Sequence, residues 1–278
     1  MSSERVFASA LFMTIIALAA INYNLDRDIT THAKTIDGLL NKERISPKSI
    51  EEIIPVEPKV KPVLYTDVDF IESLTIPEAK STFINIMLPA ILVAKEELAF
   101  QRNQVQMMLN KEKLDRLDST FLSNLFTRFK TDDLQELSKR MVTHPNSIIL
   151  AQAAVESGWG KSRFFKEANN VFGVWSMNSY EDRIPAKFSR DGKTIYLKRY
   201  PDISASIKDY FYTIGKVNAY KAFRTERLKT NSIKDLLPYL DRYSELGDEY
   251  VQQLERMIRL NGFEQFDSYE LDPTFFNK

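Results

Sequence analysis

The sequence predicts a mainly helical protein of the α+β class: a helical core with a small β-hairpin lobe, preceded by a long helix and an N-terminal hydrophobic segment. Two patterns support this prediction. Apolar residues recur every three or four positions in several stretches between residues 77 and 261, which is typical of amphipathic helices. Apolar residues alternate within residues 184–200, where Asp191-Gly192 favours a tight turn between two strands.

The composition excludes several classes of chemistry. The 278 residues suffice for one large or two modest domains, and 38 Lys and Arg residues balance 38 Asp and Glu residues. This balance does not favour a nucleic-acid-binding surface. Cysteine is absent, and the two histidines, His32 and His144, are far apart in the sequence. We therefore expect no metal or cofactor site, no thiol catalysis and no Ser-His-Asp triad.

An uncharged segment at residues 6–21 follows Arg5 and has about the length of a signal-peptide core. We expect residues 1–23 to direct export, either as an uncleaved membrane anchor or as a signal peptide cleaved near Ala17-Leu18-Ala19. A buried core helix is the remaining alternative. The absence of cysteine agrees with an oxidising compartment.

The rest of the chain divides into four predicted parts. Residues 24–62 are polar and contain three spaced prolines, so they predict an extended linker that acts as a tether. Residues 63–130 form a helical N-terminal region, residues 131–265 the main domain, and residues 266–278 an irregular, aromatic tail.

The main helix of the N-terminal region is predicted from about Pro77 to Leu117, with a kink or a break near Pro89. Its apolar positions are Ile84, Met87, Ile91, Ala94, Leu98, Val105 and Met108. These positions, from 77 to 117, suit either a coiled coil between two copies of the chain or a helix packed on the following domain. The second interpretation is favoured because the apolar seam is short and interrupted.

Periodicity and capping residues locate the elements of the main domain. His144-Pro145-Asn146-Ser147 combines a helix stop with an N-cap, and Asn261-Gly262 is a good C-cap. The basic run Arg224–Lys229 is expected on a solvated face. Helices are predicted at about residues 132–142, 147–157, 203–217, 233–240 and 248–261, with the hairpin at 184–200.

Glu156 is the residue whose position indicates catalysis. It shares a helix stripe with Ile149 and Ala153, and the helix ends directly after it at Gly158-Trp159-Gly160. A carboxyl group beside apolar residues has a raised pKa and can donate a proton near neutral pH. The glycines lack Cβ atoms, which permits close approach of a bulky ligand. The alternative is a buried ion pair, for example with Arg163.

The segment from Leu150 to Gly173 resembles the signature of the glucosaminidases of glycoside hydrolase family 73. The matching residues are Ala-x-x-Glu-Ser-Gly-Trp-Gly-x-Ser at 153–162 and Asn-Asn-x-Phe-Gly at 169–173. Within this family the chain is similar to the Bax-type subgroup of Gram-negative bacteria. The strong part of the resemblance covers about residues 131–262.

The resemblance implies a lysozyme-like helical fold in which the hairpin lobe forms one wall of a cleft. The implied reaction is hydrolysis of the β-1,4 bond between N-acetylglucosamine and N-acetylmuramic acid in peptidoglycan, in the periplasm. Glu156 matches the general acid, and Tyr243 matches a tyrosine that lines the active site. The candidate substrate-binding residues are Trp159, Asn170, Phe172, Trp175 and Tyr220.

The second catalytic group is left open by the sequence. Glu181 and Asp182 precede the first hairpin strand and are candidates for a second carboxylate. Alternatively, the N-acetyl group of the substrate acts as the nucleophile and Tyr243 assists. Two other functions remain as alternatives: a lytic transglycosylase acting on the same strands, and a non-catalytic module that binds glycan.

Overall fold

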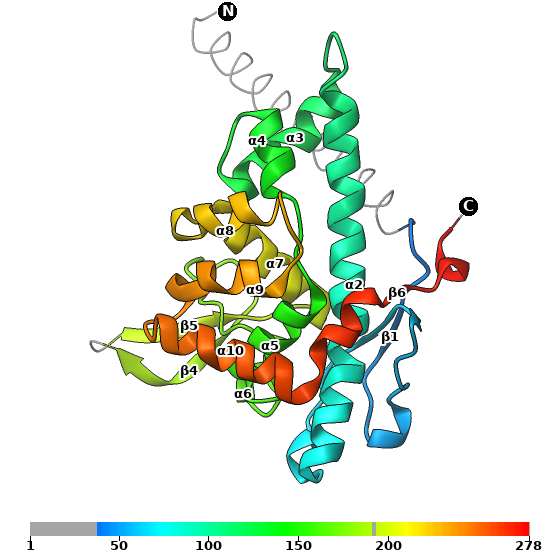
Figure 1. The fold of residues 1–278 in the computed structure, drawn as a ribbon, viewed down its shortest axis with the longest axis vertical. Coiled ribbons are helices and arrows are strands. Elements are labelled where there is room, and N and C mark those ends of the chain that lie inside the picture. The colour runs from blue at the N-terminus through cyan, green and yellow to red at the C-terminus, as the bar shows by residue number, and fades with distance from the viewer. Residues whose placement is uncertain (1–37, 191–192, 278) are drawn as a thin grey trace, which may run out of the picture.

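The computed structural model describes residues 38–190 and 193–277 (Figure 1). The predicted hydrophobic segment and the first part of the predicted tether, residues 1–37, lie outside the described residues. Within the described part of the chain, no helix is both long and apolar enough to cross a membrane. The described chain is mainly helical and carries an antiparallel β-hairpin, as the sequence predicts.

The long helix α2 (Ile76–Met108) runs through the molecule without a break. Its N-cap is Thr75, whose backbone N–H donates to the carboxylate of Glu78. The predicted break near Pro89 is wrong, because this proline lies inside the continuous helix. Its apolar neighbours Leu88 and Ile91 are fully buried. Burial contributes roughly 1.5–3 kcal/mol for each large side chain, which offsets the ~3 kcal/mol cost of an internal proline.

Helix α2 packs within the chain, as the favoured interpretation predicts. Its apolar seam is buried from Met87 to Met108 at the predicted positions, and Ile84 is half-buried. The helix ends at Met108 rather than at Leu117, and α3 (Arg116–Phe129) follows. Because intramolecular contacts cover the seam, it is not available for the coiled coil considered for residues 77–117.

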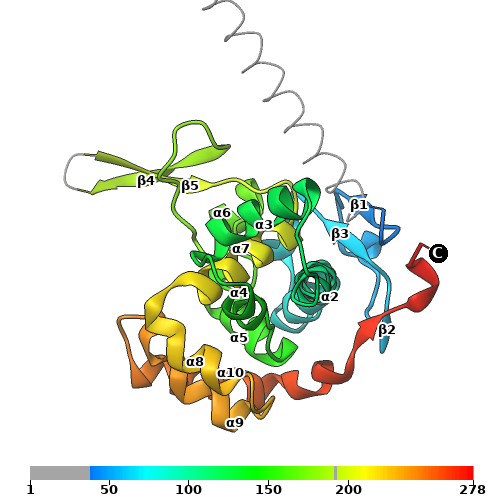
Figure 2. The same ribbon diagram turned by 90° about the horizontal axis from the view of Figure 1, so that it is seen from above.

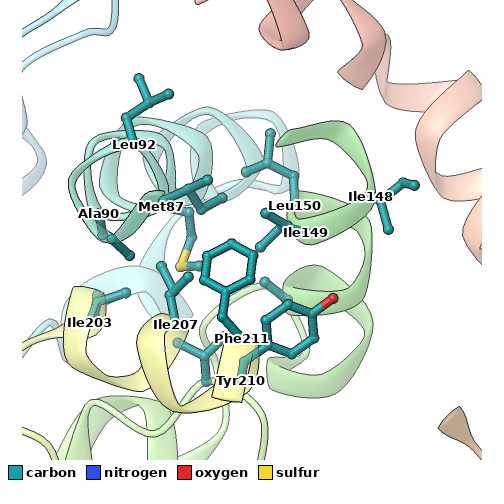
Figure 3. Packing of buried hydrophobic residues seen from close by; sticks show 14 of the residues in the cluster. Met87, Ala90, Leu92, Ile148, Ile149, Leu150, Ile203, Ile207, Tyr210 and Phe211 are labelled. Atoms are coloured by element: carbon teal, nitrogen blue, oxygen red, sulfur yellow. The ribbon is translucent and has the colours of Figure 1, made fainter. Parts of the chain in front are cut away.

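Three helices form the centre of the core: α2, α5 (Asn146–Ser157) and α7 (Ile203–Lys216). In Figure 2 the three lie side by side, with α2 seen end-on. Figure 3 shows the side chains that meet between them. The labelled residues that converge here are Met87 and Ala90 from α2, Ile149 and Leu150 from α5, and Ile207, Tyr210 and Phe211 from α7.

Helix α5 is buried on all sides over most of its length. Every residue from 146 to 154 is buried, whichever face of the helix it occupies. The boundaries of this helix agree with the prediction, but the cap does not come from the local sequence. The Asp267 carboxylate accepts hydrogen bonds from the Ser147 N–H at 2.8 Å and from the Ser147 hydroxyl at 2.7 Å. A negative charge at a helix N-terminus also interacts favourably with the helix dipole.

Residues 38–62 do not form the predicted tether in the part that is described. Strand β1 (Glu43–Ile45) pairs in parallel with β3 (Val63–Tyr65), and β2 (Lys59–Val60) pairs in parallel with β6 (Glu270–Leu271). The segment is ordered by burial, because Leu40, Ile53 and Val60 insert into the core. The predicted irregular tail therefore takes part in the fold through β6.

The hairpin consists of β4 (Arg183–Arg190) and β5 (Lys193–Lys198), and its turn at residues 191–192 lies outside the described residues. The preceding loop extends this lobe, because the Ser176 N–H donates to the Tyr196 carbonyl and the Lys198 N–H to the Val174 carbonyl. In Figure 2 the hairpin and α10 (Asp248–Asn261) lie on opposite sides of α7.

Short helices complete the domain: α4 (Leu134–Arg140), α6 (Arg163–Ala168), α8 (Lys221–Glu226), α9 (Ile233–Leu236) and a 3-10 helix (Leu237–Tyr243). The predicted C-cap of α10 is confirmed, because Gly262 adopts the left-handed conformation. The prediction of a solvated basic run is wrong for Arg224 and Arg227, which are buried. Arg224 donates to the carbonyls at the end of α7, and Arg227 donates to the Arg140 carbonyl.

Replacement of Asp267 should show how strongly the distant cap holds α5. Asp267→Ala removes both acceptors of Ser147, so we expect the free energy of unfolding to fall by about 1–2 kcal/mol. Urea denaturation followed by circular dichroism measures this loss. Glu264→Ala is the matched control, because it removes an exposed carboxylate from the 3-10 helix Phe263–Ser268, which also contains Asp267. Equal stabilities of the two variants would contradict the assigned cap.

Candidate active site

The last turn of α5 brings Glu156 to the surface. Residues 146–154 are buried and Val155 is half-buried, whereas Glu156 and Gly158 are exposed. The predicted apolar side of the helix is thus confirmed for Ile149 and Ala153 but not for Glu156. No ion pair of Glu156 occurs among the described residues, and Arg163 instead pairs with Glu167 at 2.9 Å. The alternative of a buried ion pair is therefore not supported.

Among the residues that the structure describes, the Glu156 carboxylate has one hydrogen-bond partner. The Tyr250 hydroxyl, from α10, donates to Glu156 Oε1 at 2.9 Å. Partial desolvation by the surrounding protein raises the pKa of Glu156, and the hydrogen bond from Tyr250 opposes this effect. Although its side chain is in contact with solvent, Glu156 thus holds its proton to a higher pH than an ordinary glutamate. An acid of this kind is suited to proton donation.

Aromatic rings from four elements surround this acid: α7, α10, the 3-10 helix that ends at Tyr243 and a 3-10 helix at Asn218–Tyr220. Tyr243 stacks on Tyr250 at a centroid distance of 5.6 Å and lies 5.8 Å from Tyr220. Tyr210 of α7 lies 6.2 Å from Tyr243. The charge of Glu156 contributes to raising the pKa of each of these four tyrosines, although burial is the largest cause. The structure therefore brings the predicted residues Tyr243 and Tyr220 together with Glu156.

The turn after Glu156 is left-handed at three successive residues. The φ angles are 59° at Gly158, 61° at Trp159 and 77° at Gly160. The Ser157 hydroxyl supports this turn by donating to the Ala153 carbonyl at 2.6 Å and accepting from the Gly160 N–H at 2.9 Å. A Cβ on Gly160 would approach side chains of the core to 3.0 Å. Gly160 is thus required by the backbone and the core, and not by ligand approach.

Trp159, predicted to bind substrate, packs against the core instead. Its ring contacts Phe83 and Phe263 at centroid distances of 5.5 and 5.9 Å, and the Lys80 ammonium lies 5.0 Å from its centroid. A left-handed non-glycine residue costs about 1–2 kcal/mol, and this packing holds Trp159 in that conformation. Trp175, in contrast, lies on the hairpin lobe with 48% of its surface exposed.

Asn170 and Phe172 have structural contacts of their own. Asn170 is buried, and its amide donates to the Val174 and Lys198 carbonyls and accepts from the Val174 N–H. The side chain therefore joins the loop to β5 and has no donor left for a substrate. Phe172 stacks on Tyr210 at a centroid distance of 4.5 Å.

Glu181 and Asp182, the predicted second carboxylates, lie in a different group of side chains. Glu181 pairs with Lys198 at 3.7 Å, and Asp182 pairs with Arg199 at 3.6 Å. All four residues line a cavity of about 530 Å³ that is also lined by residues of α2, α3 and α7. No described contact joins Glu181 or Asp182 to Glu156. Within the described residues, no cluster of three or more His, Asp or Glu side chains is placed to hold a metal ion.

Three residues of the site were not predicted from the sequence: Tyr210, Tyr250 and Gln152, whose amide is hydrogen-bonded to both tyrosine hydroxyls. Gln152 is a fully buried polar side chain in the middle of an apolar helix, four residues before Glu156 and therefore on the same face. This spacing is a signal that the sequence contains. Tyr250 lies 94 residues from Glu156 and has no comparable local signal.

The domain that carries this site matches a family of glycoside hydrolases. Residues 131–263 match the glucosaminidase family model, described as mannosyl-glycoprotein endo-beta-N-acetylglucosaminidase. Residues 131–263 are therefore assigned to the family 73 glucosaminidase domains. The chain is a distant homologue of protein bax of Escherichia coli (strain K12), with 22% identity over 196 residues that cover 66% of this chain and 69% of that protein.

Two solved structures are similar to the chain. The catalytic domain of the autolysin Auto from Listeria monocytogenes is 24% identical, with 60% of this chain and 97% of that chain covered and a TM-score of 0.38. The glycoside hydrolase domain of FlgJ from Salmonella typhimurium is 23% identical, with 51% and 90% covered and a TM-score of 0.36.

The raised pKa of Glu156 predicts how its replacement changes stability with pH. Below the ordinary pKa of a glutamate the side chain is protonated in the folded and unfolded chains, so Glu156→Gln should leave the melting temperature unchanged. As the pH rises through the raised pKa, the folded wild type loses stability relative to this variant. Above that pH we expect the variant to melt at an equal or higher temperature.

Differential scanning calorimetry at several pH values tests this expectation. Glu255→Gln, at an exposed position of α10, controls for the loss of one negative charge. A variant Glu156→Gln that is clearly less stable than the wild type at neutral pH would show that the carboxylate has a structural partner instead.

Proposed function

We propose that this protein hydrolyses the β-1,4 bond between N-acetylglucosamine and N-acetylmuramic acid in peptidoglycan, with Glu156 as the general acid. The observation that carries the proposal is the environment of the Glu156 carboxyl group. This group is exposed at the end of a buried helix, its pKa is raised, and its Oε1 atom accepts a hydrogen bond from Tyr250. The glucosaminidase family match of the surrounding domain supports this choice of substrate.

The hydrogen bond to Tyr250 assigns different tasks to the two carboxyl oxygens. Oε1 accepts from the Tyr250 hydroxyl, so the transferable proton is carried by Oε2. In the proposed reaction this proton passes to the glycosidic oxygen as its bond to C1 breaks. Exposure of the side chain leaves room for a substrate at this oxygen.

The nucleophile in this proposal is the N-acetyl group of the substrate. Its carbonyl oxygen attacks C1 as the glycosidic bond breaks, which forms a cyclic oxazolinium intermediate. Water then attacks C1, the bond between C1 and the acetamido oxygen breaks to regenerate the N-acetyl group, and Glu156 takes a proton from the water. The residues around Glu156 support this route, because the groups that interact with its charge are tyrosines. Tyr243 would stabilise the acetamido group by hydrogen bonding.

Digestion of purified peptidoglycan tests the reaction. Mass spectrometry of the products should show new reducing N-acetylglucosamine ends, and Glu156→Gln should lower the rate by at least about a hundredfold. Glu255→Gln should retain the wild-type rate. Anhydro-muramic ends would indicate a lytic transglycosylase, and binding without cleavage by wild type and variant alike would indicate a glycan-binding module.

Removal of the carboxylates on the hairpin lobe separates the two catalytic routes. Because Glu181 and Asp182 pair with Lys198 and Arg199, we expect Glu181→Gln and Asp182→Asn to change the turnover number less than about threefold, far below the 10²–10⁴-fold typical of a catalytic acid or base. Initial rates on purified peptidoglycan measure this. A hundredfold loss in either variant, with the melting temperature unchanged, would restore that residue as the second carboxylate.

The proposed location is the periplasm of a Gram-negative bacterium, because peptidoglycan lies there. The uncharged segment 6–21 supports export, with residues 1–23 as an anchor in the inner membrane. Cell fractionation with mass analysis of the mature chain tests this: a membrane-bound chain of full length supports an anchor, and loss of the first residues supports a cleaved signal peptide.

A further inference from the structure

A chain of buried hydrogen bonds leads from the core to Glu156. His144 Nε2 lies 2.8 Å from the Tyr210 hydroxyl, which donates to Gln152 Oε1 at 2.6 Å. Gln152 Nε2 donates to the Tyr250 hydroxyl at 3.2 Å, and this hydroxyl donates to Glu156 Oε1 at 2.9 Å. The four residues behind Glu156 are each at most 2% exposed. Water therefore does not compete for the bonds among these four residues.

The number of available protons determines which group donates in each of these hydrogen bonds. An ionised carboxylate only accepts, so the single proton of Tyr250 goes to Glu156 and its oxygen accepts from the amide of Gln152. The carbonyl oxygen of Gln152 then accepts the proton of Tyr210. The Tyr210 oxygen is left as an acceptor, which requires His144 to carry its proton on Nε2.

The state of His144 agrees with this direction. Burial lowers the pKa of His144 well below its usual value, and the nearby charges of Arg227 and Lys95 act in the same sense. The ring is therefore neutral, with one proton. Within the described residues its Nδ1 atom is buried without a hydrogen-bond partner, as expected for an unprotonated nitrogen whose proton is used at Nε2. Burial also raises the pKa of Tyr210, so this phenol stays protonated.

We propose that Gln152 is a positioning residue for Glu156: it occupies the Tyr250 oxygen as a donor and thereby fixes the Tyr250 proton on Glu156 Oε1. Tyr210 and His144 hold the Gln152 amide in the required orientation. The catalytic role of this arrangement rests on the proposed function, because Glu156 needs its proton confined to Oε2 only if it acts as a general acid. The hydrogen-bond coupling itself is independent of any reaction.

The coupling predicts a defined order of effects on the pKa of Glu156. Among the described residues, the titratable groups that interact with Glu156 are Tyr210 from α7, Tyr220 directly before α8, Tyr243 from the 3-10 helix at Leu237–Tyr243, and Tyr250 from α10. Of these four tyrosines, Tyr250 is the one hydrogen-bonded to Glu156. Loss of this bond should raise the pKa of Glu156, since the bond stabilises the charged form.

A double-mutant cycle tests the proposal on the full chain. Tyr250→Phe removes the donor and should raise the pKa of Glu156. Gln152→Leu leaves Tyr250 in place but frees its proton to turn away, so it should produce a smaller shift in the same direction. Once the Tyr250 hydroxyl is removed, Gln152 can no longer affect Glu156. The pKa of Glu156 in the double variant should therefore equal that in Tyr250→Phe alone. Carbon-13 NMR of the Glu156 carboxyl group measures each value.

Three further measurements complete the test. Gln253→Leu, at an exposed position of α10, is the control and should leave the pKa of Glu156 unchanged. Tyr210→Phe removes a single oxygen atom from the core and should also raise the pKa of Glu156. This variant replaces Gln152→Leu in the test if Gln152→Leu does not fold. Nitrogen-15 NMR of His144 should show the proton on Nε2.

Several outcomes would overturn the positioning role. They are an unchanged pKa of Glu156 in both Gln152→Leu and Tyr210→Phe, an equal shift from Gln152→Leu with and without Tyr250, or a proton of His144 on Nδ1. These readouts need no turnover. A protein that shows the coupling but leaves peptidoglycan intact would disprove the proposed function alone. For an active protein, the high-pH limb of the rate profile should move upward in Gln152→Leu.

Discussion

Burial of α5 on all sides is the constraint on which the rest of this structure depends. Packing of α2, α7 and α10 against this helix leaves its last turn at the surface. Asp267 fixes the N-terminal end, and the left-handed turn that begins at Gly158 ends the helix directly after the acid. The position of Glu156 is therefore set by a rigid core element rather than by a loop. Functional groups on rigid elements are held more accurately than groups on loops.

The same packing produces the polar partners of the acid. Tyr250 and Tyr210 belong to α10 and α7, and both rings are buried next to α5. Their hydroxyl groups need partners once they are buried, and Gln152 supplies one to each. A requirement of stability, the satisfaction of buried polar atoms, thus becomes a device that controls the proton of Glu156. Trp159 is a contrasting case: tryptophan is typical of sugar-binding sites, but here its ring packs against the core.

The hairpin lobe forms a second electrostatic unit. Asp209 of α7 accepts from both Lys198 and the Tyr200 hydroxyl, at 2.9 and 2.7 Å, and these hydrogen bonds lower its pKa against the opposing effect of burial. Through Lys198 this unit also includes Glu181. Its carboxylates are consequently engaged with cations at the base of the lobe, whereas Glu156 is surrounded by phenols. The two units differ in chemistry because cations stabilise charged carboxylates and phenols in a desolvated site do so less.

The sequence by itself determined the features that depend on neighbours within a few residues: the helical periods, the hairpin, the cap at Gly262 and the position of Glu156 at a helix end. The tertiary structure decided everything that depends on distant partners. Tyr250 lies 94 residues from Glu156, and Asp267 lies 120 residues from Ser147. It also decided the burial of Arg227 and the ordering of residues 38–62. The physical reason is that local patterns record backbone geometry and amphipathicity, whereas partners in a folded chain are chosen by packing.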